Sequence, residues 1–109
     1  MNRGVMVRYR VRPEAAARNA ELVRAVYAEL ATASPDGFAY ATYMEPDGVS
    51  FVHVATWEDG EFPLSRLPAF RAFRDGLEER CAAPLVRVEL TAVGAYRDES
   101  APAQPSQEV

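Results

Sequence analysis

The fold prediction for this chain depends on the stretch Val49–Ser50–Phe51–Val52–His53–Val54–Ala55–Thr56–Trp57. Its β-branched and aromatic residues predict a β-strand. Side chains alternate between the two faces of a strand. One face therefore carries Val52, Val54 and Thr56, and the other carries Phe51, His53, Ala55 and Trp57. The second face holds the only histidine and the only tryptophan of the chain, which makes it the first candidate for a functional surface.

The segments on either side of this strand predict the order β-α-β-β-α-β. Alternating or helical periodicity indicates strands over residues 5–11, 38–45, 49–57 and about 85–96, and a helix over residues 13–31. A second helix is expected from Pro68 until Pro84 ends it. With right-handed crossovers, this order gives an α+β, ferredoxin-like fold, an antiparallel sheet with both helices on one face.

The length and composition predict one domain followed by a tail. The chain has 109 residues, of which 49% are hydrophobic, and we assign residues 1–96 to a single domain with its own core. Residues 97–109 are rich in Ser, Pro, Gln and Ala, and we expect this C-terminal tail to be disordered because it has little to bury.

The turn Glu45–Pro46–Asp47–Gly48 predicts how the second and third strands pair. Proline at the second position and glycine at the fourth fit a type I turn closed by a glycine bulge, so Glu45 should face Val49 and Ala41 should oppose His53. We then expect the helix-facing residues to be Val7, Tyr9, Val11, Phe38, Tyr40, Val52, Val54, Val86, Val88 and Leu90. The open face should carry Met6, Arg8, Arg10, Ala39, Ala41, Tyr43, Phe51, His53, Ala55, Trp57, Arg87, Glu89 and Thr91.

An open face of this kind is too aromatic to stay in water and too polar to form a closed core. Two copies packed face to face would cover it, so the sequence predicts a homodimer. The alanines around His53 would leave a volume rimmed by Tyr43, Phe51 and Trp57, with arginines nearby, and a small-molecule pocket has this character.

Several classes of function and location are disfavoured by composition. The net charge is −4 and the arginines are scattered, which argues against nucleic acid. There is no apolar run of roughly 18 residues for a membrane span and no signal-peptide pattern, so we expect a cytoplasmic protein. Cys81 is alone, which excludes an intrachain disulfide, and one histidine among scattered carboxylates has no metal-ligand spacing.

The motifs resemble those of one known family. The helix that begins at proline, the run 36–38 (Asp-Gly-Phe) before the second strand, the run 56–58 (Thr-Trp-Glu) that ends the third, and the run 67–73 (Leu-Pro-Ala-Phe-Arg-Ala-Phe) resemble the antibiotic biosynthesis monooxygenase domain of the dimeric α/β-barrel proteins. The resemblance implies a homodimer with one cavity per subunit between sheet and helices. It also implies oxidation of polyketide- or quinol-type aromatic substrates by O2 without flavin, haem or metal.

Individual residues also correspond to particular positions of this family. Trp57 matches the tryptophan that ends the third strand in the family, His53 stands where the family has an asparagine, and Arg87 is a weaker match to a cavity arginine. Because histidine titrates near neutrality, we hypothesise that His53 is the base that deprotonates a phenol. Arg87, or Arg8 and Arg10, would hold the anion. The flat ring would stack on Trp57 and Phe51, with Tyr43 as a wall.

Other interpretations remain open. The chain could be a non-catalytic, dimeric small-molecule-binding or stress-related barrel protein, with His53 as a hydrogen-bonded interface residue. The side chains of Arg8, Arg10, Arg87 and Glu89 could form an ion-pair ladder between the first and last strands. Haem-degrading relatives of the superfamily need a histidine on the second helix, and this sequence has none after Trp57.

Overall fold

A computed structural model describes residues 3–58 and 60–96 of the chain. The strands are β1 (Arg3–Arg10), β2 (Phe38–Met44), β3 (Ser50–Trp57) and β4 (Val86–Thr91). The helices are α1 (Ala16–Ala33), α2 (Pro68–Asp75) and α3 (Leu77–Arg80), with short 3-10 turns η1 (Pro13–Ala15) and η2 (Pro63–Arg66) before α1 and α2. The predicted β-α-β-β-α-β order is confirmed.

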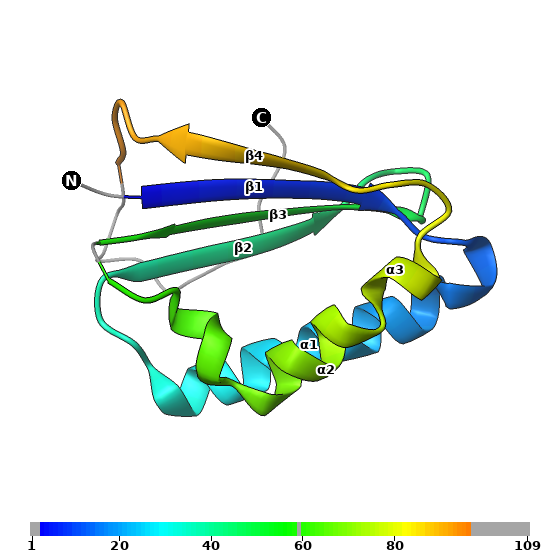
Figure 1. Ribbon diagram of the computed structural model, residues 1–109, viewed down its shortest axis with the longest axis horizontal. Coiled ribbons are helices and arrows are strands. Elements are labelled where there is room, and N and C mark those ends of the chain that lie inside the picture. The colour runs from blue at the N-terminus through cyan, green and yellow to red at the C-terminus, as the bar shows by residue number, and fades with distance from the viewer. Residues whose placement is uncertain (1–2, 59, 97–109) are drawn as a thin grey trace.

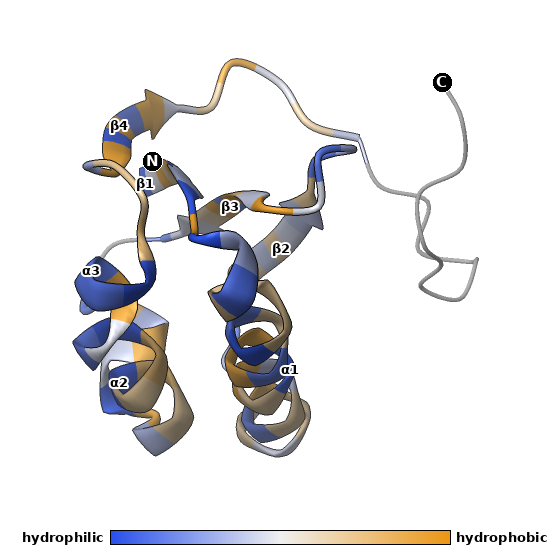
Figure 2. Ribbon diagram, turned by 90° about the vertical axis from the view of Figure 1, so that its right-hand side faces the viewer, coloured by the Kyte–Doolittle hydropathy of each residue, from blue (hydrophilic) through white to orange (hydrophobic). Residues whose placement is uncertain are grey.

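The four strands form one antiparallel sheet in the order β2-β3-β1-β4. Figure 1 shows α1 and α2 on the same face of this sheet, and Figure 2 shows the two helices side by side beneath it. None of the helices of the described residues covers the opposite face (Figure 2). This is the ferredoxin-like α+β fold that the sequence predicts. We call the two sides of the sheet the covered face and the open face.

The helices begin and end for local chemical reasons. Pro13 and Pro68 open η1 and α2, where a missing N–H costs nothing. Helix α1 ends at Ser34, which adopts the left-handed conformation and donates its N–H to the Leu30 carbonyl. The predicted second helix is shorter than expected and interrupted, because Gly76, a poor helix former, separates α2 from α3.

The core lies between the covered face and the helices. Val11, Val26 and Leu64 are at most 1% exposed, and each comes from a different segment of the chain. Together with the rings of Tyr9, Phe51 and Phe73 they form the main hydrophobic cluster.

The predicted register of the hairpin is wrong by one residue. Thr42, not Ala41, lies opposite His53, and the backbone N–H of Glu45 donates to Ser50 instead of facing Val49. The cause is Asp47, whose carboxylate accepts hydrogen bonds from the Val49 N–H at 2.9 Å, the Ser50 N–H at 2.8 Å and the Ser50 hydroxyl at 2.6 Å. These bonds hold Val49 in the loop, which is therefore one residue longer than the turn type suggested.

A shift of one residue turns every side chain of a strand to the other face. Accordingly, the prediction that His53 and Trp57 lie on the open face is wrong. The β3 residues that the prediction placed there lie under the helices, at 2–9% exposure: Phe51, His53, Ala55 and Trp57. Alternation separates the two sets of β3 residues, but both sets are apolar enough to face a core, so the pattern alone did not decide which one does.

The same correction applies to β4. Arg87 pairs with Val7 and therefore lies on the covered face together with Glu89 and Thr91. The residues predicted to face the helices, Val86, Val88 and Leu90, are 51%, 41% and 37% exposed. The strand is also shorter than the predicted 85–96, because it ends at Thr91.

The predicted C-terminal tail, residues 97–109, lies outside the described residues. Over the described ranges 3–58 and 60–96, no helix has the length and apolar character that crossing a membrane requires.

Candidate functional site

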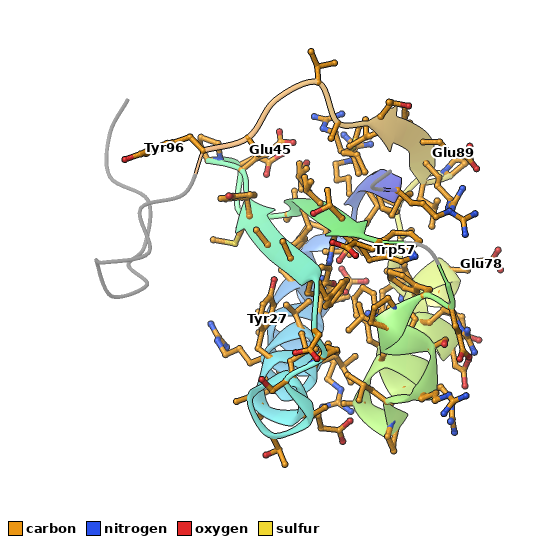
Figure 3. All side chains as sticks on the ribbon, turned by 90° about the vertical axis from the view of Figure 1, so that its left-hand side faces the viewer. Tyr27, Glu45, Trp57, Glu78, Glu89 and Tyr96 are labelled. Carbon is orange, nitrogen blue, oxygen red and sulfur yellow. The ribbon has the colours of Figure 1, made fainter. Side chains whose placement is uncertain are left out.

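A cavity of about 390 Å³ lies between the covered face and the α2 side of the helical layer. Its apolar wall includes Ala55, Trp57, Phe62, Phe70 and Phe73. In Figure 3 the Trp57 side chain lies between the sheet and the helices. An apolar chamber with a few polar groups is the usual form of a small-ligand site.

The polar wall of the cavity centres on His53. Its Nε2 atom lies 2.7 Å from the Tyr9 hydroxyl, and its Nδ1 atom lies 2.7 Å from the Tyr40 hydroxyl. The Thr42 hydroxyl lies 3.1 Å from the same Nδ1 atom. His53, Tyr9 and Tyr40 all line the cavity. Each ring nitrogen of His53 is hydrogen-bonded to one of the two tyrosine hydroxyls, so a ligand can exchange protons with the imidazole through either phenol.

A buried chain of hydrogen bonds runs from Tyr9 away from the cavity. The Asn19 amide of α1 donates to the Tyr9 hydroxyl at 3.0 Å, and its carbonyl accepts from Arg80 Nε at 2.9 Å. Arg80 also donates to the Phe73 carbonyl and lies over the Phe73 ring, 5.3 Å from its centroid. Among the described residues, no buried side-chain nitrogen or oxygen lacks a hydrogen-bond partner.

Burial sets the protonation states in this region. It lowers the pKa of His53 from 6.5 to about 4, because the imidazolium is penalised in a poorly solvated site, so the ring is neutral at pH 7. Burial also raises the pKa of Tyr9 and of Tyr40 well above 10, and both phenols keep their protons. The site thus holds a neutral base between two neutral phenols.

Two guanidinium groups line the same cavity, Arg74 of α2 and Arg87 of β4. Their side chains are 57% and 56% exposed, so the cavity opens to solvent between these two elements. The nearest carboxylate of each is loosely placed, Asp75 at 3.6 Å from Arg74 and Glu89 at 3.7 Å from Arg87. Both cations can therefore turn toward an anionic group on a ligand.

Of the residues that the sequence singled out, the structure brings His53, Trp57 and Arg87 together around the cavity. Phe51 is buried beside them and stacks on Tyr9 at 5.7 Å, outside the set that lines the cavity. The side chains of Tyr43, Arg8 and Arg10 lie on the other side of the sheet, since Tyr43 pairs with Val52 and Arg8 and Arg10 alternate with Tyr9.

The alternative interpretation, an ion-pair ladder between the first and last strands, is wrong, because Arg8 and Arg87 lie on opposite faces. Arg8 instead binds Glu45 of the hairpin, with Nε 2.7 Å from Oε2. This exposed pair holds the pKa of Glu45 below its ordinary value. Arg8 thus has a partner within the chain and stands away from the cavity.

Sequence reasoning missed Tyr9, Tyr40, Asn19 and Arg80 as site residues. One signal was available: Asn19 interrupts the apolar stripe of the first helix four residues after Ala15, and a polar residue at a core position needs partners there. No comparable signal pointed to Arg80, because this residue follows Gly76, which interrupts the helix and its apolar stripe.

Within residues 3–58 and 60–96, no group of three or more His, Cys, Asp or Glu side chains is arranged to hold a metal ion.

Solved structures share this architecture. Rv0793 from Mycobacterium tuberculosis has a TM-score of 0.72 at 20% identity, covering 89% of this chain and 100% of that one. A structure described as an antibiotic biosynthesis monooxygenase has a TM-score of 0.67 at 17% identity, covering 84% and 99% of the two chains. A variant of SnoaB, a cofactor-independent oxygenase from Streptomyces nogalater, has a TM-score of 0.64 at 20% identity, covering 89% and 98%.

No protein-family model matches the sequence, and no curated protein matches it significantly. At 16–20% identity, the structural likeness establishes the fold alone. The predicted resemblance to antibiotic biosynthesis monooxygenase structures is therefore confirmed for the ferredoxin-like α+β fold.

Proposed function

We propose that this protein is a cofactor-independent monooxygenase that oxidises a small aromatic phenol, of polyketide or quinol type, with O2. The observation that carries the proposal is the neutral imidazole of His53 on the wall of an apolar cavity, joined to that cavity by two tyrosine hydroxyls. The likeness in fold to a cofactor-independent oxygenase supports it.

The overall reaction balances with the substrate as the only reductant. A phenol with a free ring carbon and one O2 give a quinone and one water, with one oxygen atom added to the ring and the other leaving in the water. The ring supplies all four electrons that O2 accepts. The first requirement is loss of the phenol proton, because the phenolate gives up an electron far more readily than the phenol.

Both nitrogens of His53 already have hydroxyl partners, so the substrate proton reaches His53 through a tyrosine. Tyr9 accepts the proton of the substrate hydroxyl on its own oxygen and passes its existing proton to Nε2 of His53, 2.7 Å away. Because burial lowers the pKa of His53, proton transfer to the imidazole is favourable only when an anion forms beside it. Base and substrate therefore become charged together.

The remaining groups hold the anion and the ring. Tyr40 presents a second hydroxyl to the cavity, and Arg74 and Arg87 lie at its mouth. This arrangement favours an aromatic ring that carries an acidic substituent, with the ring against Trp57, Phe70 and Phe73 and the acid between the two guanidinium groups.

The same protein is proposed to be a homodimer. The open face exposes apolar side chains on both edge strands, Tyr43 (52%) on β2 and Val86 (51%), Val88 (41%) and Leu90 (37%) on β4. Exposed apolar side chains across one face of a sheet are typical of an interface. A second copy of the same sheet would cover it in a two-fold arrangement.

Oxygen uptake tests the proposal. Purified wild type is incubated with naphthols and dihydroxynaphthalenes, with and without a carboxyl group, and compared with His53→Ala. The proposal predicts uptake by wild type and a rate at least about 100-fold lower in the variant, the usual contribution of a general base. Equal rates in the two proteins would refute it. Stoichiometric binding to wild type without uptake would instead favour the alternative, a dimeric small-molecule-binding or stress-related protein.

A further inference from the structure

Arg80 is a buried cation that the proposed reaction does not use. It is 8% exposed, and it lies behind the cavity wall, over the ring of Phe73. Its side chain passes across Gly76, where an added Cβ would stand 2.9 Å from Arg80 Nη1. Burying a charge in a small domain costs free energy unless hydrogen bonds offset the loss of solvation, and each hydrogen bond of Arg80 restricts the group that accepts it.

The first bond fixes the amide of Asn19. A guanidinium only donates, so the Asn19 atom 2.9 Å from Arg80 Nε must be the carbonyl oxygen. The amide nitrogen then necessarily faces Tyr9, 3.0 Å from its hydroxyl. Asn19 is 0% exposed and cannot turn to find other partners.

The second bond fixes the proton of Tyr9. Because Asn19 donates to the Tyr9 oxygen, the hydroxyl proton must point to another acceptor. Tyr9 is 3% exposed, and the acceptor within hydrogen-bond distance is Nε2 of His53, at 2.7 Å. A buried hydroxyl that left its proton unpaired would lose about 1–3 kcal/mol.

The third bond follows from the first two. If Nε2 accepts a proton from Tyr9, neutral His53 carries its own proton on Nδ1, which donates to the Tyr40 hydroxyl at 2.7 Å and to Thr42 at 3.1 Å. Tyr40 can then offer its own proton to an acceptor in the cavity. All donors in this series of hydrogen bonds thus point in one direction, from Arg80 of α3 through Asn19 of α1 and the sheet to a ligand in the cavity.

We propose that Arg80 and Asn19 are positioning residues that hold His53 in the Nδ1–H tautomer, with Nε2 as the proton acceptor. The assignment of the tautomer depends only on the bonds above. Its meaning for catalysis rests on the proposed function: Tyr9 can pass a proton to His53 only if Nε2 is unprotonated, and Tyr40 can stabilise an anion only if its oxygen is already accepting from Nδ1–H.

The chain offers a direct test because it has a single histidine. Nitrogen-15 NMR of the imidazole at neutral pH distinguishes a protonated from an unprotonated ring nitrogen. Wild type should show an unprotonated Nε2 and a protonated Nδ1. In Asn19→Asp the carboxylate keeps Arg80 but can only accept, so Tyr9 must donate to it, and Nε2 should become protonated.

Two controls keep this test sharp. Arg18→Gln lowers the net charge by one unit, as Asn19→Asp does, at the neighbouring position in the sequence. The Arg18 side chain is 66% exposed, so this variant should leave the tautomer unchanged. Tyr9→Phe removes the donor to Nε2, and with it the acceptor of the Asn19 amide, but keeps the bond between Asn19 and Arg80. Both tautomers should then become populated, and this result is available even if Asn19→Asp does not fold. The proposal is overturned if wild type carries the proton on Nε2, or if Tyr9→Phe leaves the wild-type tautomer intact.

The NMR result does not depend on turnover. If wild type showed no oxygen uptake but had the expected tautomer, the proposed function would fail and the positioning role would stand. In an active protein, Asn19→Asp should reduce turnover by about tenfold or more, because its Nε2 no longer accepts the substrate proton.

Discussion

The covered and open faces of the sheet use the same four strands in opposite ways. The covered face has buried polar groups, Tyr9, His53 and Tyr40, that are hydrogen-bonded to one another and, through Asn19, to Arg80 of α3. It encloses a cavity, and about half of the residues that line it are buried. The open face is apolar and half exposed at Tyr43, Val86, Val88 and Leu90. This difference is the reason why we propose a reaction on the covered face, where the buried polar groups have partners within one chain, and assembly through the open face.

Filling the cavity should produce the largest effect. Ala55 is 2% exposed and lines the cavity, so Ala55→Met places a side chain where the substrate ring would lie. We expect turnover to fall by on the order of 100-fold or more, since a misplaced substrate loses its reactive geometry. Oxygen uptake measures it. Ala39→Met, on the exposed open side of β2, is the matched control, and an equal loss in both variants would contradict the assignment of the site.

Acid should destabilise the covered face through His53. Its pKa is about 4 in the folded protein and about 6.5 when the chain is unfolded, so the unfolded state takes up the proton first as pH falls. Stability should be fully present above pH 6.5 and decline toward pH 4, by about 3 kcal/mol in total.

Urea unfolding of wild type and His53→Gln across this range isolates the effect. Glu45 and Asp47 also have lowered pKa values, but they lose stability at lower pH and do so in both proteins. If the stability difference between the two proteins does not change between pH 6.5 and pH 4, the imidazole is not buried as described.

A charge on the open face should break the proposed dimer. Val88 is 41% exposed in the single chain and would be covered in the dimer, so Val88→Asp would bury an unpaired carboxylate there. We expect the dimer to weaken by about 30-fold, corresponding to about 2 kcal/mol, as measured by sedimentation equilibrium. Val93→Asp, at a fully exposed residue beyond β4, should change nothing. A wild-type protein that is monomeric at every concentration would refute the proposed dimer.

Removing one cation from the cavity mouth should have a moderate, ligand-specific effect. Arg87→Gln should weaken binding of a hydroxynaphthoate by about tenfold, corresponding to one charge-assisted hydrogen bond. Binding of the uncharged hydroxymethyl analogue should hardly change. Trp57 is the only tryptophan and lines the cavity, so its fluorescence reports both titrations. A similar loss for the two ligands would show that Arg87 does not recognise the acid.

The smallest effect concerns the hairpin that decides which face is covered. Asp47→Ala removes the three bonds to Val49 and Ser50, and we expect a loss of about 1 kcal/mol in denaturant unfolding because the loop is mostly exposed. Asp47→Asn, which keeps an acceptor, should lose less. Equal stability of wild type and both variants would mean that another interaction sets the register.

Local chemistry predicted the order of the helices and strands, but it did not predict the face of the sheet on which the site lies. The element order and the prolines that open the helices followed from local chemistry, and they are confirmed. The grouping of His53 with Trp57 followed from alternation along one strand. The choice of face did not follow, because it depended on the Asp47 side chain holding one more residue in the turn, which the turn type alone does not reveal.

The rest of the site could not be predicted for a different reason. The hydrogen-bonded residues come from two strands and two helices that are far apart in the sequence: Tyr9 of β1, Asn19 of α1, His53 of β3 and Arg80 of α3. They meet only after the sheet and helices have packed. No local pattern encodes a contact between residues 61 positions apart, such as Asn19 and Arg80. Arg87 was placed on the same face as His53 by alternation along its strand and by the resemblance, whereas Arg74, which also lines the cavity mouth, had no such signal.

The most direct test of the account is to locate a bound ligand on one face or the other. A hydroxynaphthoate is titrated into the isotope-labelled protein while the NMR signals of the His53 imidazole, the Trp57 indole and the methyl groups of Val52 and Val86 are followed. The account predicts large, saturable shifts of His53 and Trp57 at equimolar ligand, with the two valines nearly unchanged. Shifts confined to the valines, or no shift of the imidazole at saturation, would contradict it.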